Sequence, residues 1–351
     1  MAEVTESAAG NRNAMTDDEV LGMVDANRTP AAALVSTIIP VFNRAAQLRE
    51  AVHSVLAQSY RPLEIIIVDN ASTDDTARTV TALAHAHPRE VRIAQCSTRG
   101  AGAAREVGRC LARGEFIQYL DSDDVLLPGK FTAQVRALRA APQCAIAYGI
   151  TRFRSRDGQL VQGPWKGTGE QVDQLFPSML LNRWWDTSTP LYRRAIVERA
   201  GAWLNLLNEE DWEYDCRLAA MQVRLSYVPE LVSETRDHAG ERLNRGGSHD
   251  AAKLADRAQA HTLILQHALN AGITCNTPQM QHFSRALFLL ARQCGAAGLS
   301  KASQQLFNLS RDNAQPQRRK ALDYRLYALA ACLLGWRAAG KLACWRDQLR
   351  H

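Results

Sequence analysis

The sequence predicts an α/β fold in which a doubly wound, mostly parallel sheet with helices on both faces precedes a C-terminal α-helical region. Two observations support this prediction. Between residues 34 and 124, short apolar runs alternate with segments whose apolar residues have helical spacing. From about residue 250 to the end, the apolar spacing is helical throughout. The 351 residues are enough for two domains, or for one large domain with an extension.

Composition and charge exclude several classes of protein. A hydrophobic fraction of 46% and a charged fraction of 22% are ordinary for a folded soluble protein. The net charge of +6 is concentrated at the C-terminal end, because nine Lys and Arg face three Asp and Glu from Arg311 onward. The rest of the chain is close to neutral, so no nucleic acid is expected as a partner. The longest apolar run, 326–336, is shorter than the ~20 residues that cross a bilayer.

Cysteine usage and the N-terminal segment favour a cytoplasmic protein. Eight cysteines are scattered without a Cys-x-x-Cys pair, so neither a zinc ribbon nor a redox motif is expected. Free thiols in a reducing compartment are the expectation. Residues 1–33 contain few large apolar side chains and are expected to be mostly disordered. They are acidic rather than Arg-rich, so neither a signal peptide nor a transit peptide is expected.

The first expected elements alternate strand, helix and strand. A β-rich run over 34–43 contains Pro40, which cannot donate to a ladder and ends the strand. A helix follows, with apolar residues of 48–56 on one face. The next buried strand, 63–69, ends on the carboxylate of Asp69. A turn at 70–75, a helix at 77–85, a strand at 91–95 and a helix from Gly100 to about Gly114 continue the alternation.

The glycines at 100 and 102 allow two interpretations. A Gly-x-Gly pair occurs in dinucleotide-binding fingerprints, but such a fingerprint follows the first strand, and Arg105 stands where its third glycine belongs. A tight turn with close packing of the following helix is the favoured interpretation.

Three carboxylates, Asp121, Asp123 and Asp124, follow the apolar strand expected at 116–120. Unpaired carboxylates are too costly to bury, so we expect them at the strand's C-terminal end, where open α/β sheets bind ligands. Residues i and i+2 of an extended segment point to the same side, so Asp121 and Asp123 can offer oxygens to a hard cation such as Mg²⁺ or Mn²⁺. The alternative is a solvated acidic turn before the next helix.

Five motifs stand in order between residues 36 and 124. They are 38–44 (IIPVFNR), 54–60 (SVLAQSY), 64–74 (EIIIVDNASTD), 102–105 (GAAR) and 112–124 (ARGEFIQYLDSDD). Together they resemble the family 2 glycosyltransferases, whose nucleotide-binding domain has the GT-A fold. A second, looser resemblance covers about 184–248.

The resemblance implies a nucleotide-sugar donor site at the ends of the strands. Phe42 would stack on the base, Asp69 would accept a hydrogen bond from the base, and Pro40 lies in the same motif as Phe42. From the residues alone, Phe42 would be a core residue and Asp69 a helix cap. Arg105 would lie near the sugar diphosphate, where a fixed cation offsets phosphate charge. The family usually has Asn after that arginine, and here Glu106 stands instead.

The resemblance also implies a metal ion. Asp121 would lie near the ribose, and Asp123 would bind Mg²⁺ or Mn²⁺ between the two phosphates. The cation would stabilise the nucleoside diphosphate as it departs. His238 is implied as a further metal ligand, although a lone His would otherwise be a surface residue.

The acidic segment 209–211 precedes an expected helix and is implied to hold the catalytic base. Asp211 matches the general base of the family, with Glu210 beside it, and would take the proton of an acceptor hydroxyl. Attack by that hydroxyl opposite the leaving group inverts the anomeric carbon. The alternative is that acids at a helix start complement the helix dipole.

Two further regions concern the acceptor and the C-terminal end. Trp184 and Trp185 are expected to line the acceptor cleft, although core packing is an equally natural role for a Trp. The segment 242–247 is expected to form a mobile basic loop over the diphosphate. Helices are expected at 252–270, 278–296, 300–313 and 318–348. The last is basic at both ends and either packs on the catalytic domain, which is favoured, or lies on an anionic membrane surface.

These inferences predict a metal-dependent, inverting glycosyltransferase of the hexosyltransferase type. It would move a sugar from a nucleotide sugar, in the first instance a UDP-sugar, to a hydroxyl of a glycan or lipid-linked acceptor in polysaccharide biosynthesis. The expected location is the cytoplasm, with a peripheral contact on the inner face of the membrane as the alternative. The expected parts are a disordered segment (1–33), a GT-A domain (34–249) with a nucleotide-binding half (34–130) and an acceptor half (131–249), and a helical region (250–351).

Two other functions stay open at this point. A non-catalytic GT-A-like protein could bind a sugar nucleotide or a partner without transferring a sugar. A nucleotidyltransferase would need a loop rich in Gly and Lys or Arg after the first strand to hold a triphosphate, and the loop at 43–46 is poor for that purpose.

Overall fold

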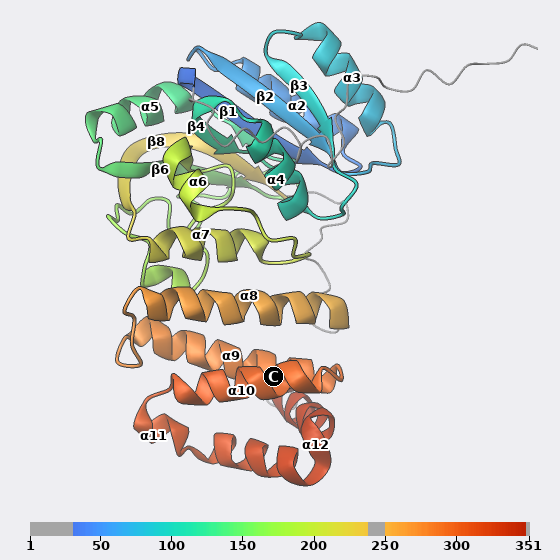
Figure 1. Cartoon of the computed structure of the whole chain (residues 1–351), viewed down its shortest axis with the longest axis vertical. Coiled ribbons are helices and arrows are strands. Elements are labelled where there is room, and N and C mark those ends of the chain that lie inside the picture. The colour runs from blue at the N-terminus through green and yellow to red at the C-terminus, as the bar shows by residue number, and fades with distance from the viewer. Residues whose placement is uncertain (1–30, 238–249, 349–351) are drawn as a thin grey trace, which may run out of the picture.

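A computed structural model of the protein describes residues 31–237 and 250–348. The sheet lies at one end of an elongated molecule, and the C-terminal helices are stacked in successive layers away from it (Figure 1). This arrangement confirms the expected α/β fold with a C-terminal helical region.

The described residues form one eight-stranded sheet in the order β3-β2-β1-β4-β7-β6-β8-β5. Strands β1 to β4 are parallel and belong to strand–helix–strand units. β7 runs antiparallel between β4 and β6, β8 is parallel to β6, and β5 is antiparallel to β8 at the far edge. The strands are β1 (Ala31–Val41), β2 (Leu63–Asp69), β3 (Val91–Gln95), β4 (Gly114–Tyr119), β5 (Val125–Leu126), β6 (Cys144–Arg154), β7 (Leu191–Arg193) and β8 (Arg224–Arg236).

Helices cover both faces of the sheet through two hydrophobic clusters. One cluster joins the sheet to α2, α3 and α5, and the other joins it to α4, α6 and α7. The second cluster continues without interruption into the C-terminal helices, so one face of the sheet and those helices share a core. The helices are α2 (Ala45–Leu56), α3 (Thr76–Ala86), α4 (Ala101–Leu111), α5 (Lys130–Ala140), α6 (Arg194–Ala200) and α7 (Glu210–Ala220), with a 3₁₀ turn at Ser178–Leu180.

β1 begins at Ala31 rather than at the expected Leu34. The Ala31 N–H donates to the Arg113 carbonyl (2.8 Å), and the Ala33 N–H donates to the Glu115 carboxylate (2.8 Å). Sheet pairing thus orders a segment whose small side chains give no strand signal. The expectation of disorder is wrong for residues 31–33, and residues 1–30 lie outside the described part of the chain.

The expected C-terminal helices are present, with two corrections. The last helix packs on the helices at 278–296 and 300–312 rather than on the catalytic domain, which was the favoured expectation, and it is not continuous. The segment expected as a single helix at 318–348 is a short helix, α11, followed by α12, and α12 is broken at Gly335. Gly335 has φ 81° and ψ 160°, a conformation that only glycine adopts at low cost. α12 therefore has one limb before Gly335 and one after it. The helices are α8 (Ala251–Asn270), α9 (Pro278–Ala296), α10 (Ser300–Asp312), α11 (Pro316–Arg319) and α12 (Leu322–Gln348).

Two further sequence-based expectations can be compared with the structure. All eight cysteines are unpaired. Within the described ranges, no helix combines the length and the apolar character needed to span a bilayer.

Candidate functional site

The C-terminal end of β4 and the start of α7 meet at Arg105 of α4, which is 3% exposed. One terminal nitrogen of Arg105 donates to Asp121 (Nη2 to Oδ1, 2.7 Å), and the other donates to Glu210 (Nη1 to Oε1, 2.8 Å). Its guanidinium also lies over the ring of Trp203, 4.8 Å from the ring centre. The structure therefore brings together three predicted site residues from three separate elements.

Glycines at the start of α4 make this meeting sterically feasible. A Cβ on Gly102 would lie 2.1 Å from the Leu204 carbonyl oxygen. A Cβ on Gly100, whose φ is 138°, would lie 2.3 Å from Asn205 Oδ1. The interpretation of this pair as a tight turn with close packing is confirmed, and the packed segment is the loop that leads to α7.

Asp211, the predicted general base, is held by Arg183. Arg183 Nη1 donates to Asp211 Oδ2 (2.5 Å), and its Nε donates to Asp215 Oδ2 (2.7 Å). The sequence reasoning missed Arg183. The available signal was a pair of opposite charges, Arg183 and Asp186, directly flanking two tryptophans.

Charges around the start of α7 separate the pKa values of its two acids. Burial would raise the pKa of Asp211, but the charges of Arg183, Arg105 and Lys166 outweigh burial and lower it. Burial and the charge of Asp211 raise the pKa of Glu210, despite the ion pair between Glu210 and Arg105. Asp211 is thus the carboxylate that stays ionised and able to accept a proton.

α8 holds the residue that precedes α7. Glu209 has a left-handed backbone, with φ 64°. Arg257 Nε of α8 donates to Glu209 Oε1 (2.9 Å), and His261 Nε2 of α8 lies 2.8 Å from Glu209 Oε2. In the same region the Leu207 N–H donates to Asp256 of α8 (2.8 Å). The loop that leads to Glu210 and Asp211 at the start of α7 is therefore fixed by the first C-terminal helix, α8.

The acidic cluster after β4 fits a divalent cation. The side chains of Asp121 and Asp123 keep 33% and 21% of their surface exposed, and Asp123 Oδ2 lies 3.8 Å from Arg44 Nε. Behind them Asp124 is buried, and burial together with the charges of Asp123, Asp121 and Asp186 raises its pKa well above the usual range. The partly exposed carboxylates of Asp121 and Asp123 offer the hard oxygens that Mg²⁺ and Mn²⁺ prefer.

The protein groups alone do not complete a metal site. In residues 31–237 and 250–348, no group of three or more His, Cys, Asp and Glu side chains is arranged to hold a metal ion. A cation at Asp123 would therefore need further oxygens, such as those of a diphosphate. His238, the predicted additional ligand, and the predicted basic loop at 242–247 lie outside the described residues.

Phe42 and Asp69 lie at the same sheet edge as Asp121, because β2, β1 and β4 are adjacent and parallel. Phe42 directly follows β1, and the Arg99 guanidinium lies 5.0 Å from the centre of its ring. One Asp69 oxygen accepts a hydrogen bond from the Ser72 N–H (3.1 Å), which caps the turn after β2. The expectation that Pro40 ends the first strand is wrong, because Pro40 pairs with Val68 inside the sheet and β1 continues to Val41. Phe42, two residues later, lies at the sheet edge.

The two tryptophans differ in position. Trp185 is 0% exposed, its Nε1 donates to Asp215 Oδ2 (3.1 Å), and its ring centre lies 5.3 Å from that of Tyr148. Its expected place in the acceptor cleft is therefore wrong, because the ring is part of the core. Trp184 is partly exposed and packs on Gly167, where a Cβ would lie 2.5 Å from the indole. Its acceptor role stays a prediction.

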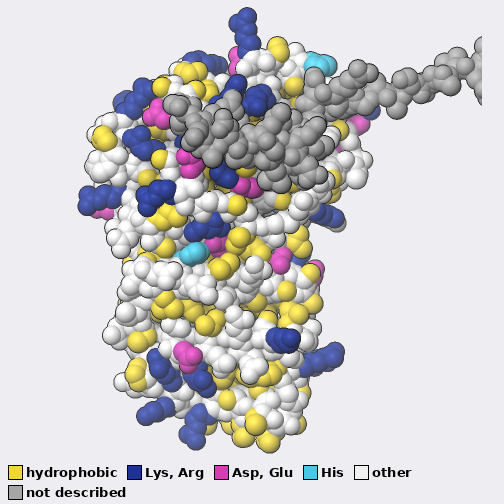
Figure 2. Space-filling view, in the orientation of Figure 1, with side chains coloured by type: hydrophobic (Ala, Val, Ile, Leu, Met, Phe, Trp, Pro, Cys, Tyr) yellow, Lys and Arg dark blue, Asp and Glu magenta, His cyan; other side chains and the backbone are white. Residues whose placement is uncertain are grey.

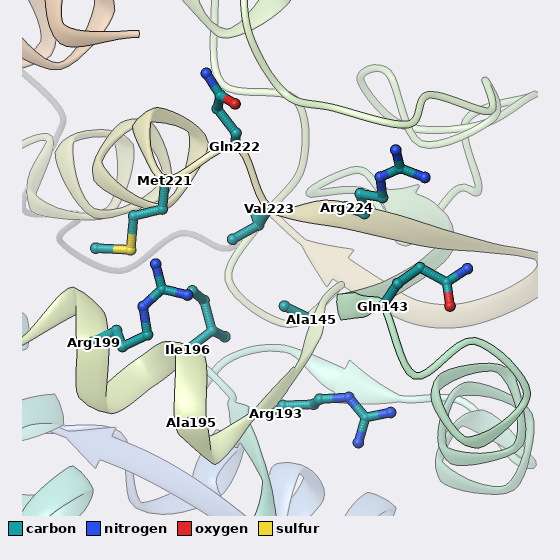
Figure 3. Close-up of a pocket in the computed structure, with 10 residues that line it drawn as sticks. All are labelled: Gln143, Ala145, Arg193, Ala195, Ile196, Arg199, Met221, Gln222, Val223 and Arg224. Atoms are coloured by element: carbon teal, nitrogen blue, oxygen red, sulfur yellow. The ribbon is translucent and has the colours of Figure 1, made fainter.

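A separate hollow of about 360 Å³ lies where β6 and β8 begin. Figure 3 shows the residues that line it. Arg193, Arg199 and Arg224 line it together with Ile196 and Val223. Arg193 is already committed to the carbonyls of Cys144 (3.0 Å) and Leu138 (2.5 Å). None of the predicted site residues lines this hollow.

The sequence model of glycosyl transferase family 2 matches residues 36–194. This region of the chain is therefore similar in sequence to that family. An uncharacterized glycosyltransferase of Nostoc sp. is 30% identical over 170 residues, which cover 47% of this chain and 52% of the relative. Escherichia coli chondroitin synthase is 36% identical over 128 residues, which cover 36% of this chain and 18% of that protein. The match thus spans about half the length of the Nostoc relative and a smaller part of chondroitin synthase.

A solved structure shares the fold of the sheet domain and of the helices that follow it. Residues 1–349 of S. aureus TarS, solved in complex with UDP-GlcNAc, match with a TM-score of 0.64 over 89% of this chain and 92% of that one, at 17% identity. The same fragment in a second structure gives a TM-score of 0.61. The fold is therefore the GT-A glycosyltransferase fold with a C-terminal helical region.

Replacing Arg105 by Met should destabilise the sheet domain by about 3–5 kcal/mol, because the buried Glu210 would lose the cation that balances its charge and the partly exposed Asp121 would lose an ion pair. Urea unfolding measures the loss. Arg109→Met is the matched control on the same helix. It breaks a partly buried i,i+3 pair with Glu106, which keeps its hydrogen bond from the Trp203 N–H, and should cost about 1–2 kcal/mol. Equal losses for the two variants would contradict the central position of Arg105.

Proposed function

We propose that the chain is an inverting glycosyltransferase that moves a sugar from a nucleotide-sugar donor to a hydroxyl of a glycan or lipid-linked acceptor. The observation that carries the proposal is the contact of Arg105 with both Asp121 and Glu210, next to Asp211. The end of β4, which is proposed to bind the donor, and the candidate base Asp211 therefore lie at one site. The UDP-GlcNAc bound to TarS supports a UDP-sugar as the first donor to test.

The donor would extend along the edge formed by β2, β1 and β4. Phe42 and Asp69 would hold the base, and Asp121 would bind the ribose. Arg105 would turn from its two carboxylates toward the diphosphate, since a guanidinium binds phosphate oxygens as well as it binds carboxylates. The Arg99 guanidinium over Phe42 occupies the ring face that a base would take, and base binding would have to displace it.

Asp123 would hold a Mg²⁺ or Mn²⁺ ion together with the diphosphate, and His238 stays a prediction as a further ligand. When bound, the cation would supply positive charge to the departing nucleoside diphosphate. Arg105 would add a fixed positive charge on the protein side of the same group.

Asp211 would take the proton from the acceptor hydroxyl. Its Oδ2 accepts from Arg183 (2.5 Å) and its Oδ1 accepts from the Trp212 N–H (2.7 Å). Each carboxylate oxygen has a second lone pair, so an acceptor hydroxyl can still donate to Asp211. The two existing hydrogen bonds would fix the orientation of the carboxylate.

Replacing Arg183 by Gln should move the acidic limb of the pH–rate profile to higher pH. Arg183 lowers the pKa of Asp211, so its removal lets burial and the neighbouring acids raise that pKa. A general base must be ionised, and activity is lost as the pH falls through its pKa. The limb should shift by about one unit or more, measured as kcat/KM against pH.

Two further variants separate this effect from general damage to the fold. Arg183→Lys keeps a positive charge and should move the limb back toward that of the wild type. Arg217→Gln removes an arginine from the same helix as Asp211, where it pairs with Glu213, and should leave the limb in place. If the acidic limb stays in place in Arg183→Gln, Arg183 does not lower the pKa of Asp211.

A panel of sugar nucleotides tests the proposed function directly. The protein with Mn²⁺ should show a rise in melting temperature and slow donor hydrolysis with one nucleotide class and not with free sugars. UDP-sugars and GDP-sugars are compared at the same concentration. Stabilisation without hydrolysis or transfer to any hydroxyl acceptor would favour a non-catalytic sugar-nucleotide binder instead. A lipid-linked acceptor would require a peripheral contact with the inner face of a membrane.

A further inference from the structure

The first limb of α12 exposes a row of leucines. Leu322, Leu326, Leu329 and Leu333 are between 49% and 72% exposed. Steps of four, three and four residues put them on one side of the helix. We refer to these four residues as the leucine face.

The opposite side of the same limb is firmly packed. The Tyr324 ring stacks on Phe288 of α9, with ring centres 4.4 Å apart, and the Tyr324 hydroxyl lies 2.5 Å from Ser310 Oγ of α10. Tyr327 and Ala331 are also buried on that side. The limb is thus anchored through one side, and packing among residues 31–237 and 250–348 leaves the leucine face exposed.

The clustering on α12 distinguishes the leucine face from ordinary surface residues. Seven of the thirteen large apolar side chains that are exposed in the described residues belong to α12. Single exposed leucines are normal on a protein surface, whereas contiguous apolar patches mark interaction sites. α12 belongs to the layer of helices farthest from the sheet (Figure 1), and the side of α12 that is opposite the leucine face packs on α9 and α10.

Along the chain, Lys and Arg residues lie before, within and after the segment that carries the leucine face. Lys320, Arg325, Arg337 and Lys341 have no carboxylate of the described residues within 4 Å. The two acids of α12 are already paired, Asp323 with Arg318 and Asp347 with Arg292. In Figure 2, hydrophobic side chains and dark-blue Lys and Arg side chains lie together at the end of the molecule formed by these helices.

We propose that the leucine face docks on the surface of a lipid bilayer that contains anionic lipids. Apolar side chains on a helix that are flanked by Lys and Arg fit such a surface, because the side chains enter the acyl boundary while the cations meet the lipid phosphates. A second copy of the chain is a poorer occupant, because a two-fold contact would bring the unpaired cations of both copies together. Trp345 in the second limb is 61% exposed beside Lys341, and indole rings favour the membrane interface.

Co-sedimentation of the full chain with vesicles tests this surface. The protein should sediment with vesicles of phosphatidylcholine and phosphatidylglycerol, and much less with vesicles of phosphatidylcholine alone. Leu326→Ser combined with Leu329→Ser should reduce binding on the order of tenfold or more, because less apolar surface enters the bilayer. Both side chains are about half exposed, so the fold should survive, and the melting temperature checks this.

Matched controls separate the leucine face from hydrophobicity and charge in general. Leu231→Ser removes a leucine that is 46% exposed on β8 and should leave vesicle binding unchanged. Lys320→Glu combined with Arg325→Glu should abolish the preference for phosphatidylglycerol. Equal binding of the wild type and the Leu326/Leu329 variant, or no binding to anionic vesicles, would overturn the proposal.

Light scattering on the same proteins tests the alternative that a second copy of the chain covers the leucine face. A wild-type dimer that becomes monomeric in the Leu326/Leu329 variant would assign the leucine face to a second copy and would overturn membrane docking. Vesicle binding is measured without donor or acceptor. Its result therefore stands or falls independently of the proposed sugar transfer.

Discussion

Replacing Asp211 by Asn should abolish sugar transfer while the protein still binds its nucleotide-sugar donor. The amide preserves the shape of the side chain but cannot accept the proton of the acceptor hydroxyl. Loss of a general base typically costs on the order of 10²–10⁴ in rate. Donor binding should change little, because Arg105 contacts Glu210 and Asp121 rather than Asp211. Transfer is measured with the donor identified by the nucleotide panel, and binding is measured by calorimetry.

Glu210→Gln is the matched comparison for this variant. Glu210 lies beside Asp211 at the start of α7 but bonds Arg105, so its removal should weaken donor binding more than it slows transfer with saturating donor. A fully active Asp211→Asn protein with an inactive Glu210→Gln protein would reverse the two roles. Full activity in both variants would remove the start of α7 from catalysis.

Asp123→Ala should remove the part of donor binding that depends on Mn²⁺. Asp123 is a partly exposed carboxylate at the end of β4, so it can reach a cation that a diphosphate shares. Without it, calorimetry of UDP binding should give the same weak affinity with and without Mn²⁺. Transfer should fall on the order of 10²-fold or more, because the leaving group would lose its neutralising charge.

Asp75→Ala serves as the control for Asp123→Ala. The Asp75 side chain is 73% exposed at the start of α3 and pairs only with Arg78 among the described residues. The Asp75→Ala protein should bind UDP and Mn²⁺ like the wild type. A manganese dependence that survives in Asp123→Ala would show that the metal, if used, is held elsewhere.

The parallel half of the sheet, β1 to β4, and the helices between its strands could be predicted because the relevant signals are local. Apolar runs such as 63–69 are too short for helices and end on turn residues, so their strand character is unambiguous. The positions of Asp69 and Asp121 at one edge then follow from parallel strand order alone. Motif resemblance supplied the same residues with roles, which periodicity could not do.

The parts that were missed depend on contacts between distant segments. Arg183 and Trp203 lie between 155 and 207, where the chain has little regular secondary structure and no hydrophobic period. Whether Trp184 or Trp185 faces solvent depends on which side Asp215 and Tyr148 occupy, which is a tertiary property. The early start of β1 likewise depends on pairing with residues 113–115.

The contacts between α8 and Glu209 determine where a chimera of this protein and a relative can be joined. Arg257 and His261 reach across to the residue just before the two acids, so the first C-terminal helix serves the chemistry even though it lies after the last strand. A chimera that joins the sheet of one relative to the helices of another should therefore keep everything through Asn270 from a single parent. A junction in the 238–249 segment would look natural on a domain map and would separate Glu209 from the side chains that hold it.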